Sequence, residues 1–114
     1  MKYLTAVLLI LVFTAMTQAK ETQNVYSPEQ GVICGKKSHF CVDQYGISMG
    51  FTKDFLGQEA VDKFMKMTDS LRDMDTTVFT FSNGLNCNTN KKICKKSKWD
   101  EKTDAHWTKI LFGT

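Results

Sequence analysis

The sequence predicts a small disulfide-stapled α+β domain, in which two cysteine-containing antiparallel hairpin units flank one amphipathic helix. Two observations predict this class. Four cysteines occur as two pairs, and six residues separate the members of each pair. Between the pairs, the apolar residues change from alternation, typical of strands, to steps of three and four, typical of a helix. The order strands, helix, strands favours an antiparallel arrangement with the helix covering one face.

The first pair predicts a hairpin with strands at about 31–35 and 39–43. A turn at 43–46 and a third short strand at 47–51 follow it, whereas residues 20–30 are interpreted as a polar lead-in that ends at Pro28. The even number of cysteines favours two disulfides, because an N-terminal segment of the chain predicts export to a compartment where disulfides persist. In a tight hairpin Cys34 falls opposite Cys41 and Cys87 opposite Cys94, so we predict these two bonds. Pairings between the two halves stay open, because four cysteines allow three connectivities.

The amphipathic segment predicts one helix at about 54–73. Leu56, Ala60, Phe64, Met67, Leu71 and Met74 form a single apolar stripe along it. Thr52 is the expected N-cap, and Gly57 marks a break near the start.

The second half predicts a three-stranded meander at about 78–82, 85–88 and 92–96. An Asn-Gly turn at 83–84 joins its first two strands. Residues 97–105 are predicted to form a charged loop, and 106–112 fit either a strand or a helical turn.

Two motifs recur in the same order and indicate an internal duplication with half-repeats at about 31–57 and 84–113. The cysteine pairs are offset by 53 residues, and the segment that begins at Phe51 resembles the one that begins at Trp107, at an offset of 56. A three-residue insertion near 98–103 accounts for the difference between the offsets. Coincidence among short motifs is the alternative.

The chain begins with a predicted secretory signal peptide at residues 1–19. Lys2 precedes an apolar stretch of about 13 residues, and small residues at Thr17 and Ala19 fit a cleavage site. The stretch is shorter than the roughly 20 residues that span a membrane, so we expect no stable membrane anchor after cleavage. The mature chain, residues 20–114, is then a single domain that is periplasmic or secreted.

Composition and motifs argue against most enzymatic and nucleic-acid functions. The 114 residues are 42% hydrophobic and 24% charged, with a formal charge of +3, which is typical of a globular domain. The sequence has no Walker loop, dinucleotide-binding fingerprint, zincin helix or nucleophile elbow. We therefore expect a protein that is not an enzyme and uses no cofactor. One Arg and a low net charge also argue against nucleic acid as a partner.

One charge cluster is a candidate binding surface. It comprises Lys91, Lys92, Lys95, Lys96 and Lys98 with the adjacent Trp99. Such a cluster can contact an anionic envelope component or an acidic protein. The alternative is that these lysines protect an edge strand from pairing with another chain. The turn at 36–39, with two lysines, a serine and a histidine, is a second candidate contact.

The remaining reactive residue types have structural explanations. Met67 and Met74 fall on the apolar stripe and favour core packing over a Cu(I) site, so no metal site is predicted. His39 and His106 lack a free cysteine with which to form a nucleophilic pair.

The cysteine units and their surroundings resemble one family of small exported bacterial proteins. The matching segments are 31–34, 40–41, 46–53, 82–84 and 111–113. They are similar to the YcgJ-type, or Fels prophage protein-like, family, and the resemblance extends over essentially the whole mature chain. It implies bacterial origin, a periplasmic or secreted location and a four-cysteine domain. The family carries no established activity, so the resemblance implies no site residue.

The sequence therefore predicts an exported structural or interaction protein that binds a protein or envelope component. Its oligomeric state is not predicted. An inhibitor of an exported cell-wall hydrolase is the alternative, because a stapled hairpin is preorganised for binding. A metal-handling protein is the third hypothesis.

Overall fold

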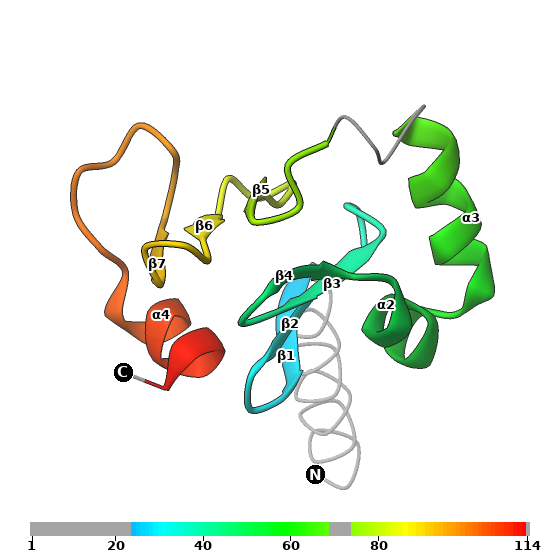
Figure 1. Ribbon diagram of the computed structural model, residues 1–114, viewed down its shortest axis with the longest axis horizontal. Helices are drawn as coiled ribbons and strands as arrows, with labels where there is room; N and C mark the ends of the chain where they lie inside the picture. Colours follow the sequence, from blue (N-terminus) through cyan, green and yellow to red (C-terminus); the bar gives the residue numbers. More distant parts are fainter. Residues whose placement is uncertain (1–23, 69–73, 114) are drawn as a thin grey trace, which may run out of the picture.

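The computed structural model describes residues 24–68 and 74–113, and it confirms the α+β class (Figure 1). A four-stranded sheet has the order β1-β2-β3-β4, and a three-stranded sheet has the order β5-β6-β7. The predicted signal peptide lies outside the described residues. The elements in chain order are β1 (Val25–Glu29), β2 (Val32–Gly35), β3 (Phe40–Asp43), β4 (Gly46–Ser48), α2 (Met49–Leu56), α3 (Gln58–Met67), β5 (Val78–Thr80), β6 (Asn86–Asn88), β7 (Ile93–Lys95) and α4 (Ala105–Phe112).

The interpretation of residues 20–30 as a polar lead-in is wrong, because β1 occupies Val25–Glu29. Tyr26 of this strand pairs with Cys34 of β2. Pro28 is tolerated because β1 is an edge strand and its register with β2 shifts between Tyr26 and Glu29.

The single helix predicted at 54–73 is divided in the structure into α2 and α3. Gly57, where the sequence predicted a break, separates them with φ of 93°, a conformation that favours glycine. The helix also begins earlier than predicted, because Ser48 rather than Thr52 is the N-cap and accepts the N–H of Phe51. This cap ends β4 at Ser48 and not at Phe51.

The apolar stripe of the predicted helix is only partly buried. Ala60 and Phe64 lie in the core, whereas Met67 is 62% exposed, so its predicted role in core packing is wrong. Leu71 lies outside the described residues. Met74 packs against the core.

The second half forms the predicted three-stranded sheet, with strands of three residues each. The Asn-Gly turn closes between Phe81 and Leu85, whose carbonyl accepts the N–H of Phe81. Residues 106–112, which fitted either a strand or a helical turn, lie in helix α4. Its N-cap, Asp104, accepts the N–H of Trp107 through its side chain.

Two apolar clusters hold the elements together. In the main core, Phe40 stacks on Phe81 with ring centroids 4.7 Å apart and also contacts Phe64 and Phe79. A Cβ atom at Gly35 would lie 2.6 Å from the Phe81 ring, so glycine permits this close approach. In the smaller cluster, Phe51, Phe55 and Leu56 of α2 cover Val32 and the first disulfide.

The two halves share one hydrogen-bond pattern at the offset of the cysteines. The Asn24 carbonyl accepts the N–H of Lys36, and the Thr77 carbonyl accepts the N–H of Thr89, with both N···O distances near 2.9 Å. Phe79 pairs with Cys87 as Tyr26 pairs with Cys34. Each hairpin also contains one non-glycine residue with positive φ, namely His39 at 63° and Lys92 at 57°.

The helices that follow the hairpins correspond at the second offset, 56 residues. Thr52 of α2 accepts the N–H of Cys41 at 2.8 Å, and Thr108 of α4 accepts the N–H of Cys94 at 2.9 Å. Gly57 and Gly113 end the respective helices. We call residues 24–57 the first unit and residues 77–113 the second unit.

Candidate functional site

The four cysteines form the two predicted disulfides. Cys34–Cys41 and Cys87–Cys94 each join directly opposed residues of a hairpin, with Cα atoms 4.1 Å apart. The N–H of Cys41 donates to Thr52 and not to Cys34, and the N–H of Cys94 donates to Thr108 and not to Cys87, so each disulfide crosses a pair without mutual hydrogen bonds. All four residues are fully buried and no cysteine is free. Their arrangement fits a structural role.

The predicted lysine surface is divided by β7 into a hairpin tip and a loop. Lys91 and Lys92 are exposed in the turn between β6 and β7. Lys96 and Lys98 are exposed beyond the other end of β7. Because a strand of three residues separates them, the two groups lie at opposite ends of one short strand.

The loop at 96–104 carries the most exposed aromatic side chain that the structure describes. Trp99 is 82% exposed, and the Nζ atom of Lys98 lies 4.8 Å from its ring centroid. Figure 1 shows this loop, in orange, on the far side of the molecule from α3. A cation held over an exposed indole forms a small amphipathic contact point.

Lys95 lies on the open face of the second sheet. It pairs with Asn86 across β6 and β7, and the neighbouring pair on that face is Asn88 with Ile93. All four residues are half-buried. This face is mostly polar.

The predicted lysines are not neutralised by ion pairs within the described residues. There, the one ion pair joins Lys63 and Glu59 on α3. Asp100, Glu101 and Asp104 balance Lys96, Lys98 and Lys102, so the loop at 96–104 has no net formal charge, although none of these side chains forms an ion pair within the described residues. The alternative was that these lysines prevent an edge strand from pairing with another chain. The structure gives it little support, because the backbone groups of Cys94 in β7 already bond to Thr108 and Asp104.

The other sequence candidates lie apart from this surface. In the turn at 36–39, Ser38 accepts the N–H of Ser82 and thereby connects the two units. Met65 and Met67 are exposed on α3, whereas Met49 and Met74 pack against the core, so the methionines do not gather at one point. No group of three His, Cys, Asp or Glu side chains in the described ranges is placed to hold a metal ion.

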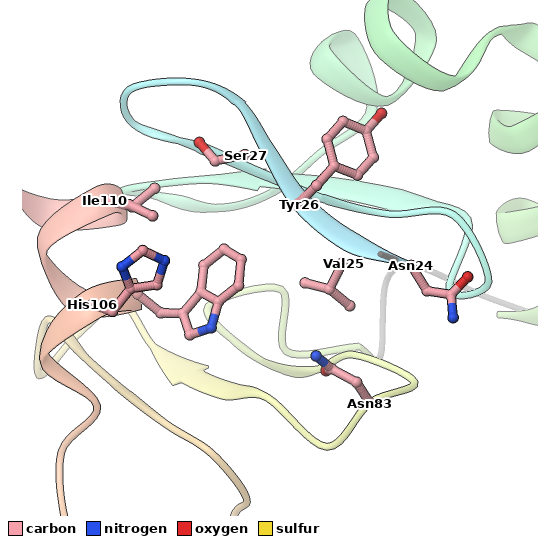
Figure 2. Close-up of a pocket in the computed structure, with 8 residues that line it drawn as sticks. Asn24, Val25, Tyr26, Ser27, Asn83, His106 and Ile110 are labelled. Carbon is pink, nitrogen blue, oxygen red and sulfur yellow. The ribbon is translucent and has the colours of Figure 1, made fainter. Parts of the chain in front are cut away.

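Sequence reasoning missed a groove between β1 and α4, because β1 itself was missed. We call it the β1–α4 groove; its volume is about 510 Å³ and Figure 2 shows its walls. One signal was present, since Val25 and Tyr26 precede Val78 and Phe79 by the same 53 residues that separate the cysteines. The lining residues are Asn24, Val25, Tyr26, Ser27, Asn83, His106, Trp107 and Ile110.

A second groove lies where the first unit meets the end of α4, and its volume is about 460 Å³. Phe51, Tyr45 and Phe112 contribute aromatic side chains, and Glu29 and Asp43 contribute carboxylates. Phe51 corresponds to Trp107 of the β1–α4 groove. The two grooves therefore place equivalent aromatic residues in different polar surroundings.

One carboxyl group outside these surfaces has a shifted pKa. The hydroxyl and the N–H of Thr77 both donate to Asp75 and hold its pKa below the ordinary value of 3.8. These bonds fix the chain just before β5.

None of the helices in the described ranges has the length and apolar character needed to cross a membrane.

Comparison with known proteins identifies the family. The YcgJ protein family model matches residues 25–112. A curated relative, the uncharacterized protein YcgJ of Escherichia coli (strain K12), is 29% identical over 109 residues, which cover 90% of this chain and 84% of the relative. No solved structure matches the chain. The matched range includes both cysteine units and all helices and strands described here, and the chain belongs to the YcgJ family.

Proposed function

We propose that the protein is an exported, non-enzymatic binding protein and that the loop at 96–99 contacts an anionic lipid surface of the envelope. The observation that carries the proposal is the position of Lys98 over the 82% exposed ring of Trp99. The predicted signal peptide and the two buried disulfides support export.

The chemistry of this loop suits a membrane interface. An indole ring favours the headgroup region of a bilayer, where its apolar face and its N–H group are both accommodated. Each lysine near an anionic membrane contributes about 1 kcal/mol of attraction. Lys96 and Lys98 lie beside Trp99, and neither forms an ion pair within the described residues.

The same loop contains features that limit the affinity. Asp100 and Glu101 follow Trp99, and a negative membrane repels them. A single indole also buries little apolar area, and stable anchoring needs two signals. We therefore expect weak, reversible binding that decreases as ionic strength rises.

Vesicle co-sedimentation tests the proposal. We expect the purified protein to bind phosphatidylglycerol vesicles and not phosphatidylcholine vesicles at low salt. The double variant Lys96→Glu/Lys98→Glu should weaken binding at least tenfold, because two attractive charges become repulsive. Trp99→Ala should weaken it about threefold.

A matched control removes the effect of net charge. Lys53 and Lys66 are exposed on α2 and α3, so Lys53→Glu/Lys66→Glu changes the total charge equally at a distant site. This variant should retain most of the binding. Equal losses in the two double variants, or equal binding to both vesicle types, would contradict the proposal.

An inhibitor of an exported hydrolase is the second candidate, supported by the hairpin of β6 and β7. Its disulfide lies directly behind a turn that exposes Asn90, Lys91 and Lys92. A rigid tip loses little entropy when it enters an active-site cleft. Nanomolar inhibition of a cell-wall hydrolase that is abolished by Lys91→Ala/Lys92→Ala would favour this function over lipid binding.

A further inference from the structure

We propose that the β1–α4 groove binds a neutral saccharide. This inference is independent of the lipid contact, since Lys96, Lys98 and Trp99 do not line the groove. Its volume, about 510 Å³, falls within the range of small-molecule sites and accommodates one or two sugar rings.

The lining residues match the mixed character of a sugar. No Lys, Arg, Asp or Glu lines the groove. An ion would therefore lose hydration without meeting an opposite charge, and a wholly apolar ligand would cover amide groups without bonding to them. A sugar ring presents C–H groups on its face and hydroxyls around its rim. The indole of Trp107 and the side chains of Val25 and Ile110 can pack against the face of the ring. The side-chain amides of Asn24 and Asn83 can form hydrogen bonds with the hydroxyls around its rim.

Asn83 provides an oriented donor. Its Oδ1 atom accepts the N–H of Leu85 at 3.0 Å, which fixes the amide and leaves Nδ2 available for a ligand. Figure 2 shows that the Asn83 nitrogen points from the turn between β5 and β6 toward the space below β1. A hydroxyl oxygen of a sugar is a suitable acceptor for this group.

Trp107 and His106 add further polar groups on the opposite wall. Within the described residues, neither the indole N–H of Trp107 nor the ring of His106 forms a hydrogen bond. The two rings meet edge to face with centroids 5.1 Å apart. An indole N–H donates only, whereas an imidazole can donate and accept, so a ligand with many hydroxyls can satisfy both.

The groove is held rigidly by its supporting elements. The N–H of Trp107 is bound by Asp104, and the next residue, Thr108, is hydrogen-bonded to Cys94 of the second disulfide. The β1–β2 turn joins α4 through the N–H of Gly31 and the carbonyl of Ile110. A preformed site reduces the entropic cost of binding a weakly held ligand such as a sugar.

The two tryptophans allow a test by NMR. Isotope-labelled protein is titrated with cellobiose, maltose and di-N-acetylchitobiose, and separately with glucuronate and inorganic phosphate. We expect at least one neutral disaccharide to shift the indole N–H signal of Trp107 while that of Trp99 stays unchanged. The anions should bind more weakly, because the groove offers them no cation.

Conservative variants connect the binding to the proposed contacts. Asn83→Asp keeps the acceptor for Leu85 and removes the amide donor, and Trp107→Phe keeps a ring and removes the N–H. Each should weaken binding about fivefold, as expected for one lost hydrogen bond. Trp99→Phe and Lys96→Glu/Lys98→Glu are controls that should leave saccharide binding unchanged.

The proposal is overturned if none of the three disaccharides shifts the Trp107 signal. It is also overturned if an anion binds more tightly than every disaccharide, or if both groove variants bind as the unaltered protein does. Dispersed amide spectra of the variants verify that each is folded. The variant Lys96→Glu/Lys98→Glu separates the two proposals, because it should change lipid binding and leave saccharide binding unchanged.

Discussion

The two hairpins have the same backbone pattern but opposite surroundings on one face. In the first unit, Ile33, Phe40 and Val42 lie on this face and are all buried in the main core. The equivalent residues of the second unit are Asn86, Ile93 and Lys95, and they are half-buried on an open sheet. The first hairpin is therefore covered on both faces, whereas the second leaves one face available for contacts outside the fold.

The connections between hairpin and helix differ in a related way. In the first unit, Ser48 ends β4 in register with Cys41 and caps α2. In the second unit, Asp104 caps α4 and donates its N–H to the Cys94 carbonyl at 2.7 Å. The anchoring is conserved between the units, but the second connection is three residues longer and carries Lys98 and Trp99. Together these differences suggest that the first unit supports the fold and that the second provides the exposed surface.

The largest expected effect concerns the equivalent residues Phe40 and Ile93. Phe40→Ala removes a ring that contacts three other aromatic rings, so the free energy of unfolding should fall by about 3–5 kcal/mol. Ile93→Ala should lower it by about 1 kcal/mol, because Ile93 is only half-buried. Urea unfolding followed by circular dichroism measures both values. Equal losses would contradict the assignment of the two hairpin faces.

The two disulfides should contribute equally to the free energy of unfolding, although one face of each hairpin differs in burial. Each closes a loop of the same length, and the chain-entropy relation assigns about 2.5 kcal/mol to each. Replacement of Cys34 and Cys41 by serine should therefore destabilise the protein as much as replacement of Cys87 and Cys94. Thermal denaturation of the two double variants compares them. A much larger loss for one pair would show that packing, and not loop closure, dominates.

The equivalent threonines of the two units, Thr52 and Thr108, test whether one hydrogen bond has the same role in both units. Thr52→Val and Thr108→Val each remove the acceptor of a buried cysteine N–H while preserving side-chain shape. Each change should lower the free energy of unfolding by about 1–3 kcal/mol, the cost of an unsatisfied buried donor. Amide hydrogen exchange should also become faster at Cys41 in the first variant and at Cys94 in the second. Unchanged exchange in either variant would argue against the shared role.

The smallest effect is expected at Asp75, which precedes the second unit. Because Thr77 lowers the pKa of Asp75 in the folded protein, the ionised carboxylate stabilises the fold above pH 3.8, and this contribution is lost as the pH falls through the lowered pKa. The melting temperatures of the unaltered protein and of Asp75→Asn should therefore converge below about pH 4. Thermal melts between pH 6 and pH 2 measure the difference. A difference in melting temperature that stays constant over this pH range would contradict a stabilising role of the ionised Asp75 carboxylate.

The sequence was sufficient for the disulfides and for most of the second sheet. The equal spacing of the cysteines and the Asn-Gly turn are local signals, and each determines a pairing over a few residues. The sequence indicated the break at Gly57, which the structure confirms, but it placed the N-cap at Thr52, whereas Ser48 caps α2 and sets an earlier helix start.

The parts that were missed depend on contacts between distant residues. β1 contains Pro28 and a register shift, so its local pattern does not indicate a strand, and only its pairing with β2 defines it. The β1–α4 groove requires β1, the Asn83 turn and α4 together, and so lay beyond local reasoning. Of the six residues of the predicted lysine surface, five are exposed and Lys95 is half-buried, and their separation by β7 followed only from the structure.

One measurement tests the division between the two units most directly. Amide spectra of the labelled protein are recorded with and without phosphatidylglycerol bicelles. We expect the shifted signals to lie within the loop at 96–99, with the largest change at the Trp99 indole. Shifts concentrated in the first unit, or no shift at Trp99, would contradict the account in which the second unit provides the binding surface.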